Sequence, residues 1–382
     1  MSTPEPFRLH VSDADLEDLR RRLRATRWPD REVVKDWSQG VPLAYAQEVA
    51  TYWAERYDWR AREALINEFP QFRLQVNGLG IHFIHLRSSE PNAVPLLMTH
   101  GWPGSIVEFL KVLRPLAEPR QYGGNAGDAF HIVCPALIGY GFSDKATEPG
   151  FGIPQIAELW DQLMVSLGYT QYLAQGGDWG AAVTTEIGMQ DRGHCRAIHL
   201  NSPIAQPTPE ALKNPTAEDK VAFDARAHYL DQEVGYSSQQ ATRPQTLGYG
   251  LADSPMAQAM WIIEKFWSWT DCDGHPENVL TRDELLDNVM FYWLSNSGTS
   301  SARLYWESFR KSLGGTATVK LPTGCSLYPK ELSKPPRSWV ERRYEKLVYW
   351  NPLPKGGHFA AFEQPELFVR EIRDCFRSLR QA

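Results

Sequence analysis

GGDWG, at residues 176–180, marks an abrupt change in the pattern of this chain. An apolar, strand-like run at 172–174 precedes it, and a helix-like run at 181–187 follows. Small residues on both sides of one reactive side chain are typical of a nucleophile elbow, a strand-to-helix turn too tight for Cβ atoms at its flanks. The reactive side chain here is the carboxylate of Asp178. Such an aspartate can displace a leaving group at saturated carbon and form an alkyl ester with the enzyme.

Two other glycine-containing loops support this interpretation, because a lone G-x-D-x-G is also common in surface turns. A buried-strand pattern ends in HGWPGS at 100–105, where Pro103 fixes a bend and the N–H of Trp102 can be held toward a reaction site. A late strand pattern ends in GGHFAAFE at 356–363, and this loop contains His358. Three such loops in this order are hard to obtain by accident.

With these loops, the chain resembles the epoxide hydrolases, in the branch that includes the microsomal and juvenile hormone enzymes and their soluble bacterial and fungal relatives. Those proteins share the three loops and a segment like PTGCSLYPKEL at 322–332. The resemblance covers nearly the whole chain, including the N-terminal region. It implies an α/β-hydrolase fold with a mostly parallel central sheet, a helical lid insertion and an N-terminal meander.

The resemblance also implies a role for each reactive residue. Asp178 is the nucleophile, His358 activates water, and Glu331 orients the histidine. Their order along the chain is nucleophile, acid, histidine, as in α/β-hydrolases. The backbone N–H groups of Trp102 and Trp179 form the oxyanion hole, in which the second donor is the residue after the nucleophile.

The acid of this triad is open between two glutamates. Glu331 lies in the segment that carries the acid in related enzymes, and no aspartate occurs between Gly324 and Trp339. Glu363, just after the histidine loop, is the alternative, and we interpret it as structural. A histidine base works only as neutral imidazole, so its acid has to fix the tautomer and stabilise the imidazolium that forms.

A long aromatic and helical segment at 204–315 interrupts the alternation of strands and helices, where this fold accepts a lid. Most of its aromatic rings are expected in the lid's own core. Tyr236 and Tyr305 match by position the lid tyrosines that the resembling family directs at the epoxide oxygen. The alternatives, if either assignment is shifted, are Tyr292, Tyr249 and Tyr229.

The chain is expected to divide into an N-terminal extension, two parts of one hydrolase core and the lid between them. A capped amphipathic helix is predicted after Ser12, and a hairpin around the Asn77-Gly78 turn. Alternating strands and helices in the first core part predict a parallel sheet. The expected boundaries are 1–90 for the extension, with core strands from about 72, then 91–203, 204–315 for the lid, and 316–382.

Composition agrees with a soluble enzyme and narrows its partners. A net charge of -6 and a pI near 6.0 argue against a nucleic-acid or anionic-membrane partner. Five scattered cysteines without C-x-x-C spacing indicate reduced thiols of a cytoplasmic protein, rather than disulfides or a zinc site. The first residues have no signal-peptide pattern, and no stretch is apolar for long enough to span a bilayer. The oligomeric state is open, with a homodimer as one arrangement.

The predicted function is the conversion of an apolar epoxide and water to a vicinal diol, through a hydroxyalkyl ester on Asp178 and without a metal or organic cofactor. Haloalkane dehalogenase activity is an alternative to this prediction, because haloalkane dehalogenases share the fold, the aspartate and a tryptophan after it. The lid tyrosines and the N-terminal extension favour the epoxide. A non-catalytic binder with a hydrolase fold is the other alternative, but it has no need of a nucleophile, an acid and a base together.

Overall fold

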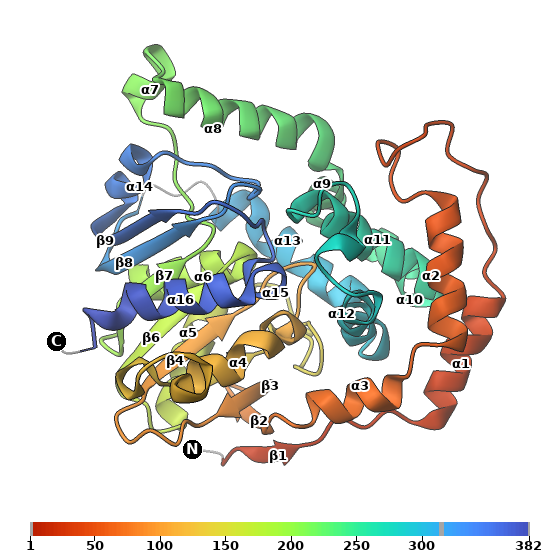
Figure 1. Cartoon of the computed structure of the whole chain (residues 1–382), viewed down its shortest axis with the longest axis horizontal. Coiled ribbons are helices and arrows are strands. Elements are labelled where there is room, and N and C mark those ends of the chain that lie inside the picture. Colours follow the sequence, from red (N-terminus) through yellow and green to blue (C-terminus); the bar gives the residue numbers. More distant parts are fainter. Residues whose placement is uncertain (1–2, 313–316, 381–382) are drawn as a thin grey trace.

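The computed structural model describes residues 3–312 and 317–380, and within them nine strands form one twisted sheet (Figure 1). Their order across the sheet is β1-β2-β3-β5-β4-β6-β7-β8-β9. The strands are β1 (Glu5–Phe7), β2 (Gln71–Val76), β3 (Leu79–Leu86), β4 (Val94–Thr99), β5 (Phe130–Pro135), β6 (Tyr172–Gly176), β7 (Cys195–Leu200), β8 (Val319–Leu327) and β9 (Tyr344–Pro352).

The six strands from β5 to β9 in this order run parallel, whereas β1, β2 and β3 are antiparallel to their neighbours. Parallel strands bring their carboxyl ends to the same edge, where α/β proteins build their sites. Thr99, the last residue of β4, pairs with Gly176, the last residue of β6. This register brings the loop after β4 directly beside the GGDWG turn.

Helices cover both faces of the sheet (Figure 1). On one face α4 (Leu110–Ala117) packs against α16 (Pro365–Arg377), and on the other α5 (Ile153–Ser166) packs against α6 (Asp178–Gln190). The central strands are therefore buried on both faces, which explains why their sequences are continuous apolar runs. The remaining core helices are α14 (Arg337–Arg343), α15 (Ala360–Glu363), η1 (Ile106–Phe109), η2 (Pro119–Tyr122) and η3 (Ala126–Asp128).

A helical lid is inserted between β7 and β8, over the carboxyl edge of the sheet. One of its helices, α8, extends beyond the rest of the lid at the top of Figure 1. The elements of the lid are α7 (Pro209–Lys213), α8 (Ala217–His228), a π-helical turn η4 (Tyr229–Glu233), α9 (Gly235–Thr242), α10 (Pro244–Asp253), α11 (Pro255–Trp269), η5 (Pro276–Asn278), α12 (Arg282–Leu294) and α13 (Gly298–Ser312).

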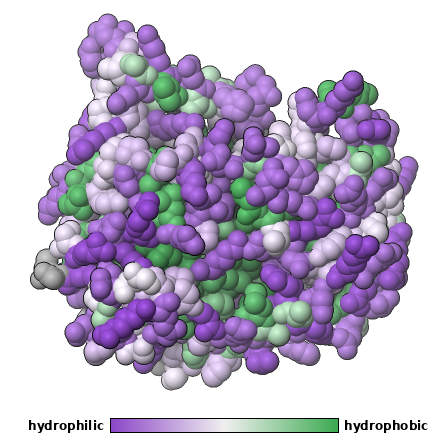
Figure 2. Space-filling view, in the orientation of Figure 1, coloured by the Kyte–Doolittle hydropathy of each residue, from purple (hydrophilic) through white to green (hydrophobic). Residues whose placement is uncertain are grey.

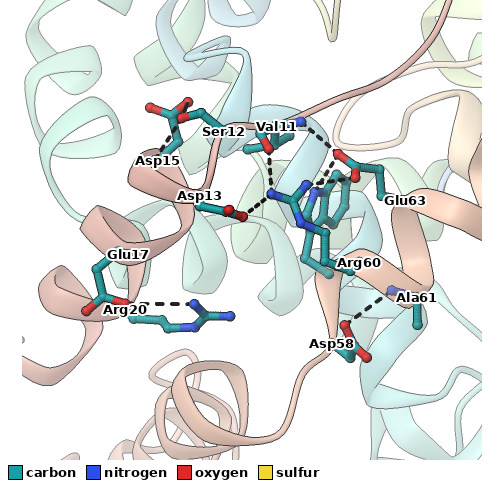
Figure 3. A network of polar contacts seen from close by, with 11 residues as sticks. Val11, Ser12, Asp13, Asp15, Glu17, Arg20, Asp58, Arg60, Ala61 and Glu63 are labelled. Atoms are coloured by element: carbon teal, nitrogen blue, oxygen red, sulfur yellow. Dashed lines mark hydrogen bonds and ion pairs between the residues drawn. The ribbon is translucent and has the colours of Figure 1, made fainter.

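The N-terminal extension forms α1 (Asp13–Arg24), α2 (Leu43–Glu55) and α3 (Trp59–Ile66), and runs along the lid (Figure 1). The predicted helix after Ser12 is present, and the Ser12 hydroxyl accepts from the N–H of Asp15. Figure 3 shows how Arg60 joins α3 to this helix start, through Asp13 and the carbonyl of Val11. The extension also contributes β1, an edge strand that the sequence did not indicate.

Carboxylates of the lid tie it to the extension. Asp287 on α12 is buried, and it accepts from the Tyr57 hydroxyl at 2.7 Å and from Nε of Arg62 at 2.9 Å. Tyr45 and Tyr52 make similar bonds, to Glu277 at 2.8 Å and Asp283 at 2.7 Å. The extension therefore fixes the outer side of the lid through side chains with defined partners.

The face of the molecule seen in Figure 2 is mainly hydrophilic. Figure 2 shows one face, on which apolar residues appear in smaller groups between polar ones. In the described part of the chain, no helix is both long enough and apolar enough to cross a membrane.

Candidate active site

The turn between β6 and α6 forces Asp178 out of the sheet. Asp178 has a φ of 49°, in the left-handed region that side chains other than glycine rarely adopt. A Cβ on Gly176 would lie 2.1 Å from the carbonyl oxygen of Gly180, and a Cβ on Gly180 would lie 1.9 Å from that of Thr99. The glycines of GGDWG are thus required by close backbone approach, as expected at a nucleophile elbow.

The two oxygens of Asp178 have different partners. The N–H of Trp102 donates to Oδ1 at 2.8 Å, and Nε2 of His358 lies 3.4 Å from Oδ2. Gly101 permits this approach, because a Cβ there would lie 2.2 Å from Oδ1. Trp179 follows in the first turn of α6, where backbone N–H groups have no partner within the helix. Oδ1 therefore lies at the N–H of Trp102, and Oδ2 is the oxygen that faces His358.

His358 is held between the core and the lid. Its Nδ1 lies 2.8 Å from Oε1 of Glu331, and its backbone N–H donates to the carbonyl of Trp269 at 2.8 Å. Burial by itself would lower the pKa of His358, but the nearby charges of Glu331 and Asp178 outweigh it and raise the pKa well above its usual value. In the free protein the two carboxylates therefore favour the protonated imidazole.

The structure brings Glu331, and not Glu363, to the imidazole ring. Glu331 follows β8 and is itself fixed by the N–H of Leu332, which donates to Oε1 at 2.7 Å. Glu363 instead accepts from the N–H of Asp271, at 2.8 Å, and so joins the histidine loop to the end of α11. Burial raises the pKa of Glu363 to about 7.

Tyr236 and Tyr305 lie in the lid directly over the two candidate oxyanion residues. The ring of Tyr305 meets that of Trp179 edge-on, with centroids 4.8 Å apart, and the ring of Tyr236 stacks on Trp102. The Tyr305 hydroxyl is buried and has no hydrogen-bond partner within residues 3–312 and 317–380. Burial raises the pKa of both phenols well above the usual value, so both keep their protons at neutral pH.

The other three tyrosines have different surroundings. The Tyr292 hydroxyl donates to the carbonyl of Gly104 at 2.7 Å, so it is committed to the loop after β4. Tyr249 is 71% exposed and points away from the core. Tyr229 borders the same cavity as Tyr236, and its hydroxyl donates to that of Tyr236 at 3.5 Å.

A cavity of about 310 Å³ joins these groups to the surface. The candidate reactive residues all border it, which brings Asp178, His358, Glu331 and the two lid tyrosines together. Its outer part passes between α8 and the segment after β8. The other lining side chains include Trp179, Ile204, Ala205, Pro207, Ala222, Arg226, Tyr229, Phe309, Leu332, Lys334 and Trp339. The lining is therefore largely apolar around a polar end.

Sequence reasoning missed a group of lid residues that supports the site. Trp269 lies against the imidazole of His358, with ring centroids 5.0 Å apart, and its Nε1 donates to Oε2 of Glu233 at 2.9 Å. Lys265 pairs with the same carboxylate at 3.3 Å and lies 5.0 Å from the centre of the Tyr236 ring. These contacts join residues that are far apart in sequence, so no local sequence pattern predicts them.

Among the residues that the structure describes, no group of three or more His, Cys, Asp and Glu side chains is arranged to hold an ion. The sheet order, the elbow and the histidine paired with a carboxylate define the protein as an α/β-hydrolase whose nucleophile position holds an aspartate.

Comparison with known proteins gives the family. The family described as epoxide hydrolase N terminus matches residues 4–109, and the one described as alpha/beta hydrolase fold matches residues 94–247. A protein of Stigmatella aurantiaca, provisionally named an epoxide hydrolase, is 51% identical over 98% of this chain and 85% of its own length. The chain belongs to the epoxide hydrolase family.

Two solved structures agree with this assignment over essentially the whole chain. Juvenile hormone epoxide hydrolase from the silkworm Bombyx mori is 31% identical, with a TM-score of 0.91 over 100% of this chain and 96% of that one. The epoxide hydrolase of Aspergillus niger is 32% identical, with a TM-score of 0.88 over 99% and 97% of the two chains. The predicted fold class, with its mostly parallel sheet, is confirmed.

Proposed function

We propose that this protein hydrolyses an apolar epoxide to a vicinal diol, through a covalent ester on Asp178. The observation that supports this best is the shared cavity, in which Asp178 and the hydroxyls of Tyr236 and Tyr305 meet. An epoxide needs a nucleophile on carbon and a proton donor on oxygen at the same time. The largely apolar lining favours a substrate whose remaining parts are apolar.

In the first step, Oδ2 of Asp178 attacks one epoxide carbon from the side opposite the C–O bond that breaks. The electron pair of that bond goes to the epoxide oxygen, which takes a proton from Tyr236 or Tyr305. The raised pKa values of these buried phenols keep the proton available at neutral pH. The product is a hydroxyalkyl ester of Asp178, with its carbonyl oxygen Oδ1 at the N–H of Trp102.

Ester formation turns His358 into a base. In the free protein, burial lowers the pKa of His358, while Glu331 and Asp178 raise it further than burial lowers it. Esterification removes the charge of Asp178 and with it one of the two charges that hold the proton. The pKa of His358 therefore falls, and the released proton replaces the one that the tyrosine gave to the epoxide.

In the second step, neutral His358 takes a proton from water, and the water oxygen attacks the ester carbonyl carbon. The N–H groups of Trp102 and Trp179 stabilise the oxyanion, and Glu331 stabilises the imidazolium. The ester C–O bond breaks, and the departing alkoxide takes the second hydrogen of the former water to become the diol. Asp178 is thereby restored as a carboxylate beside protonated His358. No step requires a group beyond these side chains and water.

The experiment that tests this proposal is a single turnover in ¹⁸O-labelled water with enzyme in excess over an epoxide. The first diol should carry unlabelled oxygen, because that atom comes from Asp178. Label in the first diol would mean that water attacks the epoxide itself. Release of halide from chloro- or bromoalkanes, with no diol from epoxides, would favour a dehalogenase instead.

We keep the cytoplasm as the proposed location. The five cysteines are all free and buried, which suits a reducing compartment. A homodimer also stays a prediction, and size-exclusion chromatography with light scattering is the measurement that tests it.

A further inference from the structure

A second, smaller cavity lies against Asp178 and His358, separate from the one under the lid tyrosines. Its volume is about 20 Å³, and the same two residues border both cavities. Asp178 and His358 therefore stand between a large cavity and a small one, and the small one has Glu108 and Asn201 as its other polar residues. The small cavity is closed by the loop after β4, by Asn201 after β7 and by the start of α15.

Glu108, on η1, supplies a carboxyl group to the small cavity. Its side chain is folded over Gly104, because a Cβ on Gly104 would lie 2.7 Å from Oε2 of Glu108. Within residues 3–312 and 317–380 this carboxyl has no hydrogen bond or ion pair, and its electrostatic neighbours are His358 and Asp178. Glu108 is half-buried, so its carboxyl oxygens remain available to a molecule held in the small cavity.

The charge state of Glu108 follows from its surroundings. Burial raises its pKa to about 8, His358 opposes the shift, and Asp178 adds to it. The group is therefore a neutral acid near pH 7, with one O–H donor and one carbonyl acceptor.

The size and lining of the small cavity suit one water molecule. A buried water needs roughly 10–15 Å³ of such space and two to four polar partners. Glu108, His358 and the amide of Asn201 supply them. The oxygen Oδ1 of Asn201 is already bonded to Nε2 of Gln175, at 2.9 Å, which leaves the Asn201 N–H groups available.

Hydrolysis of the ester needs water on the side of Asp178 that faces the small cavity. Once Asp178 is esterified, the alkyl group occupies the large cavity below Tyr236 and Tyr305, and it blocks water from that direction. The small cavity still borders both the ester group and His358. Water held there can reach the ester carbon without passing the bound alkyl group.

We propose that Glu108 is a positioning residue that holds the hydrolytic water in this small cavity, between His358 and the ester carbon of Asp178. The inference rests on the proposed ester mechanism. The water donates one hydrogen to the carbonyl oxygen of Glu108 and gives the other, as a proton, to Nε2 of His358. Its oxygen forms the new bond to Cγ of Asp178, the ester C–O bond breaks, and the departing alkoxide takes the remaining hydrogen of that water to become the diol, which leaves Asp178 as a carboxylate.

The test separates the two half-reactions in Glu108→Ala, Glu108→Gln and wild type, with styrene oxide as the probe. Alkylation does not use water, so it should stay within about threefold of wild type in every variant. Ester hydrolysis should fall about tenfold or more in Glu108→Ala, the effect of losing one hydrogen bond to the attacking water. Glu108→Gln should recover most of this loss, because glutamine is a neutral match for the protonated acid.

Two further variants make the outcome independent of folding. Gly104→Ala should slow hydrolysis selectively as well, because its Cβ would displace the Glu108 carboxyl while leaving that residue in place. Glu90→Gln, at a half-buried glutamate paired with Arg120 far from the site, is the control and should change neither step. The alkylation rate itself reports whether each variant has folded.

Ester hydrolysis at the wild-type rate in both Glu108→Ala and Gly104→Ala would overturn the inference. Equal slowing of both steps would also overturn it, because that result indicates a structural role. Ester hydrolysis that is as slow in Glu108→Gln as in Glu108→Ala would contradict the inference that a neutral side chain at this position holds the water. If wild type itself forms no ester, the mechanism proposed above fails, and this result is distinct from any defect confined to the variants.

Discussion

The ring of Tyr236, on the lid, lies parallel to the ring of Trp102, in the loop after β4, with centroids 4.7 Å apart and planes 8° apart. Trp102 also donates its backbone N–H to Asp178. One residue therefore fixes both the nucleophile and the lid tyrosine above it. The stacked pair sets the distance across which an epoxide has to fit.

The lid tyrosines should act in ring opening only. Tyr236→Phe and Tyr305→Phe each remove one hydroxyl and keep the ring, so each should slow ester formation by about tenfold or more, with little change in ester breakdown. Two donors share one oxygen, so each can partly cover the loss of the other. Rapid-quench measurement of both steps checks this. A double mutant that alkylates at the wild-type rate would exclude both residues.

His358→Gln should still open the epoxide but should stop at the ester. The glutamine cannot accept a proton from water, whereas ring opening uses Asp178 and the tyrosines. Intact-protein mass spectrometry should show an adduct equal to the mass of the substrate, on the peptide that contains Asp178. Turnover in wild type without any trapped adduct in the variant would contradict this division of roles.

Glu331→Gln should slow ester hydrolysis by at least about tenfold, and Glu363→Gln should slow it less. Only Glu331 contacts the imidazole, at 2.8 Å, whereas Glu363 bonds to the backbone of Asp271. The opposite ranking would assign the acid role to Glu363.

The pH dependence of ester hydrolysis should report the charge of Glu331. Hydrolysis needs neutral His358, so its rate should rise with pH through the His358 pKa. Glu331 raises that pKa, so its replacement by glutamine should move this rise to lower pH while lowering the maximal rate. Single-turnover decay of the ester from pH 5 to 9 measures both effects. An unmoved profile would mean that the charge of Glu331 does not act on the base.

Arg62→Ala should lower the free energy of unfolding by about 3 kcal/mol, because it leaves the buried carboxylate of Asp287 without its cation. Burial raises the pKa of Asp287, and Arg62 opposes this shift. Without Arg62 the pKa rises further, so the loss should shrink as pH falls and Asp287 takes up a proton. Urea unfolding at pH 5 and pH 8 checks both parts. Arg114→Ala, which breaks an exposed pair with Glu68, is the matched control and should cost much less.

The sequence predicted the parts of the molecule that have a local signature. The Asn77-Gly78 hairpin is present, with φ values of 48° and 80° at its two turn residues. The sheet edge at which the three glycine-containing loops meet follows from strand order and from the last residues of β4 and β6. By contrast, β1 has three residues including a proline, a pattern too short to distinguish from a loop.

The residues that support the site could not be predicted, because their roles come from tertiary neighbours. Glu108 looks like an ordinary residue of a helical turn until the fold closes a cavity around it. Glu233 and Lys265 are 32 positions apart, and their pairing depends on how η4 and α11 pack. The roles of the predicted site residues themselves stay predictions until the kinetic experiments are done.

The bond between the His358 N–H and the Trp269 carbonyl makes the lid and the base mechanically one unit. Asp287 bonds the outer side of the lid to the N-terminal extension, and Glu363 bonds its inner side to the histidine loop. Wholesale swinging of the lid would pull the base away from its acid. Substrate and product then have to pass through the opening of the cavity between α8 and the segment around Lys334. The width of this opening therefore limits the size of the epoxides that can enter.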